Sequence, residues 1–257
     1  MQRYFIELCF DGTAYHGWQI QANATSVQGE VNKALSTILQ TDIFVTGAGR
    51  TDTGVHALQM FCHFDAELSE LDVNKLVYQL NAFLPSEIAI KSLIKVSAAA
   101  NCRFDASSRT YLYKIVQEKD PFFINRAWYY PFELDFDLMN KACEVLKTYR
   151  NFASFSKVGS EVKTDICDLM EAEWKKNEGI VLFSVTADRF LRNMVRAIVG
   201  TMVEVGSGKM DLDEFRNVIE SSDRSKAGFS APACGLYLKS ITYPYELTPL
   251  NNAKGFG

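Results

Sequence analysis

The stretch Ile43–Phe64, IFVTGAGRTDTGVHALQMFCHF, is the starting point for predicting the fold. It begins with a short apolar run, Ile43–Thr46, and ends with a second, Leu58–Phe64, in which Met60, Cys62 and Phe64 alternate as in a strand with one face buried. Between these runs lies a glycine-rich polar loop. The pattern predicts two strands joined by a loop that carries an arginine, an aspartate and a histidine.

The segments around this stretch predict a ferredoxin-like half. We expect strands at Tyr4–Phe10 and Ile88–Val96, and a helix that starts at a capping box formed by Thr25 and Gln28. The apolar stripe of that helix is Val27, Val31, Ala34, Leu35 and Ile38. A second helix is expected over Asp72–Phe83, ended by Pro85, with the inward residues Leu76, Val77, Leu80 and Phe83. The order β-α-β-β-α-β is that of the split βαβ arrangement, in which both helices cover one face of an antiparallel sheet.

The second half of the chain repeats this order. The predicted elements are strands at Arg109–Gln117, Asp168–Lys175, Ile180–Ala187 and Leu236–Thr242, and helices at Phe136–Tyr149, Phe190–Val205 and Leu212–Ile219. We therefore predict an α+β protein with domains 1–106 and 107–257, each ferredoxin-like, with their sheets side by side and a cleft between them.

Composition narrows the class of protein. The 257 residues are 47 % hydrophobic and 23 % charged, and no apolar run is long enough for a membrane span or a signal peptide, so a cytoplasmic protein is expected. Six scattered cysteines without a CxxC pair predict reduced, mostly core thiols. A net charge of −4 argues against indiscriminate binding of nucleic acid but allows a local basic cleft.

Several functions that a glycine-rich loop can have are not supported by the residues present here. A phosphate-binding P-loop needs a lysine and a hydroxyl after its last glycine, whereas Val55 and His56 follow Gly54. Asp52–Gly54 spells the DTG triplet of aspartic peptidases, but that chemistry needs two carboxylates and the chain has one such triplet. None of the three histidines lies on a predicted helix with an acidic residue at ligand spacing, so no metal site is expected.

The whole chain resembles the tRNA pseudouridine synthases of the A type. Gly49–Ala57 matches the family loop GRTDxGVHA at every fixed position. Six further segments follow in the family's order: FDGTAYHGWQIQ (10–21), NAFLP (81–85), RFDASSRTYLY (103–113), NFASF (151–155), FLRNMVR (190–196) and GLYL (235–238). The family's fold is two ferredoxin-like halves that share a continuous antiparallel sheet with a central catalytic cleft, in agreement with the element order above.

This resemblance implies an isomerase that converts uridine to pseudouridine at positions 38, 39 and 40 of the tRNA anticodon arm. The base leaves its ribose at N1 and returns through C5, so no redox cofactor, nucleotide or metal is needed. The family also implies a homodimer in which one tRNA contacts both subunits.

The resemblance assigns roles to individual residues. Asp52 corresponds to the nucleophile, which attacks either C1′ of the ribose or C6 of the uracil. Tyr111 corresponds to the tyrosine that stacks on the base and removes its C5 proton, and Arg196 to the basic residue that pairs with the aspartate and keeps it ionised. Arg50 is expected to assist base flipping.

The remaining assignments concern substrate contacts. We expect Phe190 and Leu236 to line the uracil pocket, with core packing as the alternative, and His56 and Val55 to support the loop. Candidates for phosphate contacts are Arg103, Arg109, Lys157, Lys163, Arg189 and Arg192. A non-catalytic RNA-binding module is the main rival function, because ferredoxin-like sheets also bind single strands.

Overall fold

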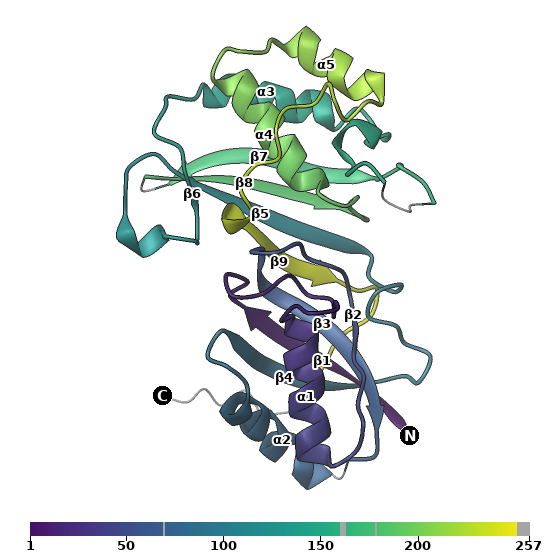
Figure 1. The fold of residues 1–257 in the computed structure, drawn as a ribbon. Coiled ribbons are helices and arrows are strands. Elements are labelled where there is room, and N and C mark those ends of the chain that lie inside the picture. The colour runs from purple at the N-terminus through teal and green to yellow at the C-terminus, as the bar shows by residue number, and fades with distance from the viewer. Residues whose placement is uncertain (69, 160–162, 178, 251–257) are drawn as a thin grey trace. The chain divides into compact units, whose positions relative to one another are not determined.

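The computed structural model describes residues 1–250 apart from residue 69, residues 160–162 and residue 178 (Figure 1). The chain is a mixed α+β protein and divides into two compact units, one formed by Met1–Ser107 with the chain from Leu238 onward, the other by Ser108–Tyr237. The C-terminal strand thus groups mainly with the N-terminal residues. The predicted domains 1–106 and 107–257 stay a prediction.

The first unit holds strands in the order β4-β1-β3-β9, in which β1 is antiparallel to both β4 and β3, and the two-residue strand β2 pairs antiparallel to β3. Helices α1 and α2 contact each other and cover one face of this sheet (Figure 1). The elements are β1 Gln2–Phe10, α1 Val27–Leu39, β2 Thr46–Gly47, β3 His56–Ala66, α2 Glu70–Phe83, β4 Ile88–Val96 and β9 Leu236–Thr242.

Both faces of the β1–β3 pair are buried. Met60, Cys62 and Phe64 alternate along β3 as predicted, and all three are at most 2 % exposed. On the opposite face the ring of Tyr243 packs against Phe5 and Phe61, with ring centroids 5.7 and 5.4 Å apart. Burial on both faces explains why β1 and β3 carry more apolar residues than a half-exposed strand requires.

Three details of this unit differ from the sequence prediction. Ser26, not Thr25, caps α1, because its backbone is extended and its Oγ accepts a hydrogen bond from the Gly29 N–H at 3.2 Å. The predicted inward residue Phe83 is 43 % exposed, because Leu84, four residues after buried Leu80, takes the inward direction.

The predicted strand Ile43–Thr46 is also mostly wrong, since only Thr46 joins the ladder. The reason is that side chains of α1 replace the ladder partners. Ser36 Oγ accepts from the Ile43 N–H at 2.9 Å, and Asn32 Oδ1 accepts from the Val45 N–H at 2.9 Å.

The second unit contains the strand order β5-β8-β7, with β5 and β7 each antiparallel to β8, and β6 adds to β5 in parallel. Helix α3 contacts β7 and α4, and α5 packs on α3 and α4 (Figure 1). The elements are β5 Ser108–Val116, η1 Pro121–Phe123, β6 Trp128–Tyr129, α3 Phe136–Leu146, η2 Ala153–Phe155, β7 Leu169–Asn177, β8 Ile180–Ala187, α4 Met194–Gly206, α5 Leu212–Ser221 and η3 Ala233–Gly235.

The prediction of a helix from Phe190 is wrong at its start. Helix α4 begins at Met194, because Asn193 has a left-handed backbone with φ of 66° and therefore cannot belong to the first turn. Its side-chain amide instead donates to Ser230 Oγ at 2.7 Å. Phe190 consequently lies on a connection between strand and helix, where its ring is not committed to a helix face.

The cysteine prediction is confirmed for the described residues: all six are free thiols, four of them buried. Among those residues, no helix combines the length and the apolar character that crossing a membrane requires.

Candidate active site

The loop Gly47–Ala57 leaves β2 and enters β3, so its conformation is fixed at both ends by the sheet of the first unit. Arg50 is exposed and Asp52 is half-buried. The Val55 N–H donates to the Asp52 carbonyl at 3.2 Å and Gly54 has φ of 76°, so residues 52–55 form a tight turn that needs a glycine. Asp52 is therefore the first residue of a tight turn.

A second loop, Asp11–Trp18, holds this turn by its backbone. The Gly54 N–H donates to the Tyr15 carbonyl at 3.3 Å, and the Trp18 N–H donates to the Thr51 carbonyl at 3.4 Å. These bonds lie on the two sides of Asp52. The Thr51 hydroxyl, by contrast, is buried and has no hydrogen-bond partner among the described residues.

Two glycines of this second loop make the approach possible. A Cβ on Gly12 would lie 2.0 Å from the Val55 carbonyl oxygen, and one on Gly17 would lie 2.2 Å from the Thr51 carbonyl oxygen. Both distances are far below van der Waals contact, and Gly17 also has φ of 90°. The sequence analysis missed this role, because nothing local in FDGTAYHGWQIQ shows which backbone the glycines meet.

His56 links the same two loops through its side chain. It is 2 % exposed, and its Nδ1 lies 3.1 Å from the Gly12 N and 3.2 Å from Asp11 Oδ1. The register of β1 on β3 shifts between Leu8 and Phe10, next to this point, as expected for a bulge that redirects a side chain. The contacts agree with the predicted supporting role of His56.

Tyr111 and Phe190 come together in the second unit. Tyr111 lies on β5 opposite Val185 of β8, and its ring meets that of Phe190 edge to face, with centroids 5.0 Å apart and planes at 86°. Both side chains are half-buried. An edge-to-face pair restricts the orientation of both rings.

Arg196 lies in the first turn of α4 and is tied to the segment that precedes β9. Its Nε donates to the Ala231 carbonyl at 2.7 Å, and the Ala231 N–H donates back to the Arg196 carbonyl at 3.0 Å. The side chain is half-buried, and this bond fixes the plane of the guanidinium. The predicted ion pair between Asp52 and Arg196 stays a prediction.

Leu236 is 6 % exposed, which favours core packing, the alternative that the sequence left open. The segment before it is held by Tyr113, whose hydroxyl donates to the Pro232 carbonyl at 2.7 Å. Burial raises the pKa of Tyr113 well above its ordinary value, so the phenol stays protonated and acts as a donor.

The candidate phosphate-binding side chains fall into two groups. Arg103, Lys157, Lys163 and Arg192 are exposed. Arg109 and Arg189 are half-buried and donate to backbone carbonyls, Arg109 to Asp188 at 2.8 Å and Arg189 to Thr164 at 2.9 Å. The second group therefore also has a structural task.

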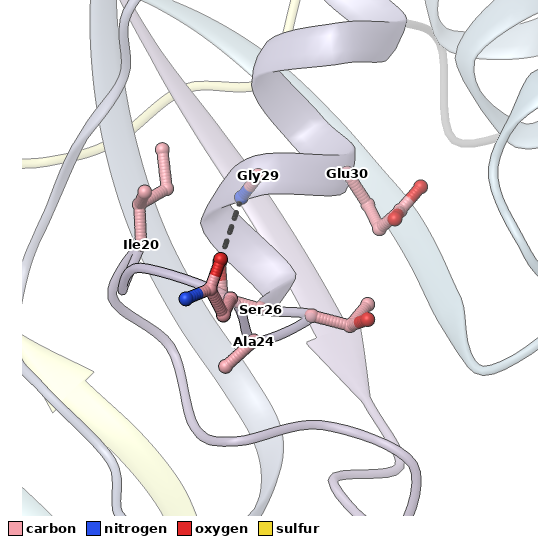
Figure 2. Close-up of a pocket in the computed structure, with 7 residues that line it drawn as sticks. Ile20, Ala24, Ser26, Gly29 and Glu30 are labelled. Carbon is pink, nitrogen blue, oxygen red and sulfur yellow. Dashed lines mark hydrogen bonds between the residues drawn. The ribbon is translucent and has the colours of Figure 1, made fainter.

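A hollow at the start of α1 lies outside this constellation. Figure 2 shows the Ser26 cap at its base, and none of the predicted site residues lines it. Within the described part of the chain, no cluster of three or more histidine, cysteine or acidic side chains is arranged to hold a metal ion.

Comparison with known proteins identifies the family. A family model described as tRNA pseudouridine synthase matches residues 9–105 and 142–244. A protein of Bacteroides fragilis named tRNA pseudouridine synthase A is 51 % identical over 250 residues, which cover 96 % of this chain and 98 % of that protein. A Caldicellulosiruptor bescii protein with the same name is 38 % identical over 246 residues, covering 95 % and 100 %. On these matches, the chain belongs to the tRNA pseudouridine synthase family.

Proposed function

We propose that this chain isomerises uridine to pseudouridine at positions 38, 39 and 40 in the anticodon arm of tRNA, with Asp52 as the nucleophile. Family membership supports the reaction and the tRNA substrate. The observation that supports the residue assignment is the turn at Asp52 on the connection between β2 and β3. The backbones of Gly12 and Gly17 pack closely against the carbonyls of Val55 and Thr51 on either side of Asp52 and hold the turn in place.

The reaction balances without a further reactant. If the Asp52 carboxylate attacks C1′, it forms an ester as the N1–C1′ bond breaks, and it leaves C1′ when C5 of the turned base bonds there. If it attacks C6, the C6–O bond breaks after the C5–C1′ bond has replaced the N1–C1′ bond. In both cases C5 ends without its proton and N1 gains one. An aspartate is ionised at neutral pH and can act as this nucleophile without activation by a metal.

Tyr111 is proposed to stack on the uracil and to remove the C5 proton. The edge-to-face contact with Phe190 supports a stacking role, because it holds the phenol ring in one orientation without covering it completely. Arg196 is proposed to pair with Asp52, its guanidinium held in place by Ala231. The pairing would keep the carboxylate ionised when bound RNA excludes water.

Arg50 is proposed to assist the extrusion of the target base. Its side chain is exposed on the same rigid loop, two positions before Asp52. Flipping a base out of a stem costs a few kcal/mol, and a planar cation can fill the gap or bind the displaced phosphate.

The proposed fold is a pair of ferredoxin-like halves that share a continuous sheet. The protein is proposed to act as a homodimer in the cytoplasm. The family model matches two separate segments, one in each half of the chain, which supports two related halves. A dimer would also let an acidic chain gather basic surface for tRNA.

The test uses tRNA labelled with tritium at C5 of uridine, because only isomerisation releases that tritium to water. Wild type should release label from transcripts whose only labelled uridine is at 38, 39 or 40. Asp52→Ala and the isosteric Asp52→Asn should release none while melting at the wild-type temperature. Release by either variant would refute the nucleophile assignment, and an inactive wild type that still binds tRNA would favour the RNA-binding alternative.

A further inference from the structure

We infer that His56 is a positioning residue for the reaction: its imidazole couples the Asp52 turn to the Asp11–Trp18 loop and thereby sets the position of the Asp52 carboxylate. The inference rests on the proposed nucleophilic role of Asp52.

The coupling follows a short chain of contacts. His56 Nδ1 lies 3.1 Å from the Gly12 N. The backbone of Gly12 packs against the Val55 carbonyl so closely that a Cβ has no room, and the Val55 N–H closes the turn on the Asp52 carbonyl. A displacement of the Gly12 backbone should therefore also displace Val55 and, with it, the turn at Asp52.

Among the described contacts between the Asp11–Trp18 loop and the residues from Thr51 to His56, those of His56 are made by a side chain and the others by the backbone. Gly54 and Trp18 donate to carbonyls, and Gly12 and Gly17 meet carbonyl oxygens. His56 is also 2 % exposed beside a bulge in the β1–β3 pairing, an arrangement that serves to direct one side chain.

Nδ1 of His56 can bind either of two neighbouring groups of the Asp11–Trp18 loop, although not both at once. As an acceptor, Nδ1 takes the Gly12 N–H; as a donor, it binds Asp11 Oδ1 at 3.2 Å, an oxygen that also accepts from the Thr13 N–H at 2.9 Å. In either tautomer His56 holds the start of the Asp11–Trp18 loop. A side chain that carries a donor and an acceptor at the Nδ1 position should therefore replace it.

Asparagine meets this requirement, because its amide group occupies the position of Nδ1. Glutamine places its amide nearer to Nε2, and leucine fills the volume without hydrogen bonds. We expect His56→Leu to lower kcat for tritium release by about 10- to 100-fold, the effect of a nucleophile misplaced by about 1 Å, with KM for tRNA changed less than about threefold. His56→Asn should retain kcat within about threefold.

The matched control is His63→Leu. His63 is also buried, at 7 % exposure, and lies further along β3, where it contacts Cys102 and not the Asp52 turn. It should change the melting temperature but leave kcat within about twofold of wild type. This control separates a general effect of removing a buried imidazole from an effect on the nucleophile.

Unchanged kcat in His56→Leu would overturn the inference, as would an equal loss in His56→Asn and His56→Gln. If His56→Leu melts below the assay temperature, the comparison of Asn with Gln decides alone. Asp52→Ala is assayed in parallel: its activity would refute the proposed function, whereas active His56 variants beside an inactive Asp52→Ala would refute only the positioning role.

Discussion

Two tyrosines on the same face of β5 should respond in opposite ways to removal of the hydroxyl group. Tyr113 is fully buried, and its hydroxyl donates to the Pro232 carbonyl at 2.7 Å. A Cβ on Gly235 would lie 2.6 Å from its Cζ, so the ring is tightly packed and phenylalanine should keep its place.

The expected loss of stability in Tyr113→Phe follows from this single bond. Removing one partner of a buried neutral hydrogen bond destabilises a protein by about 1–3 kcal/mol. In a chain of this size each kcal/mol lowers the melting temperature by about 2–4 °C, so a decrease of about 2–12 °C is expected. Turnover should stay within about threefold, because the reciprocal bonds between Arg196 and Ala231 remain.

Tyr111→Phe should show the reverse. Tyr111 is half-buried, and its ring contact with Phe190 does not need the hydroxyl, so the melting temperature should fall less than in Tyr113→Phe. If the phenol removes the C5 proton, turnover should fall by about 10²- to 10⁴-fold.

Calorimetry and tritium release on both variants check this pair of predictions. The reasoning is refuted if Tyr111→Phe turns over at the wild-type rate, since the hydroxyl would then have no part in proton removal. It is equally refuted if Tyr113→Phe melts as wild type, because the bond to Pro232 would then carry no stability.

Three further predictions concern packing and pH. Gly49→Ala should leave the melting temperature nearly unchanged, because no heavy atom lies within 4 Å of the added Cβ. Gly47→Ala should lower the melting temperature, because its Cβ would lie 2.2 Å from the indole nitrogen of Trp18. Equal melting temperatures of the two variants would contradict this reasoning. Gly200→Ala should destabilise α4 although alanine favours helices by about 1 kcal/mol, since the Cβ would lie 1.8 Å from the Phe229 carbonyl oxygen; a stabilised variant in chemical denaturation would show the argument to be wrong. Burial, and secondarily Arg3, lowers the pKa of His63 below its ordinary 6.5, so protonation favours the unfolded state and the free energy of unfolding should fall as pH drops below about 6.5. His63→Gln should flatten that fall between about pH 7.5 and 5.5, and an unchanged slope in denaturation curves would exclude His63 as its source.

Much of the secondary structure was predictable because it depends on residues close in sequence. The bounds of β4 and β9 agree with the prediction, and the alternation of Met60, Cys62 and Phe64 identified one face of β3. The prediction was wrong where a contact with a residue distant in sequence determined the local conformation. Asn193 turns into a left-handed conformation and bonds to Ser230, so α4 starts later than its apolar pattern suggests.

The candidate site divides in the same way. The loop motif identified Asp52 as a candidate site residue, and other matched segments identified Tyr111 and Arg196, because a family motif can be recognised from the residue types and their spacing alone. Their surroundings were not predictable. Phe190 was expected near the uracil, but its contact with the ring of Tyr111 depends on where the chain leaves β8.

The sequence by itself determined the order of strands and helices, the polar loop between two strands and the family, because hydrophobic period, turn residues and motif spacing are local properties. The tertiary structure alone decided how the Asp52 turn is held. Gly12 and His56 stand 44 positions apart, and the need for a glycine and an imidazole at those places arises only when the fold brings the two loops into contact.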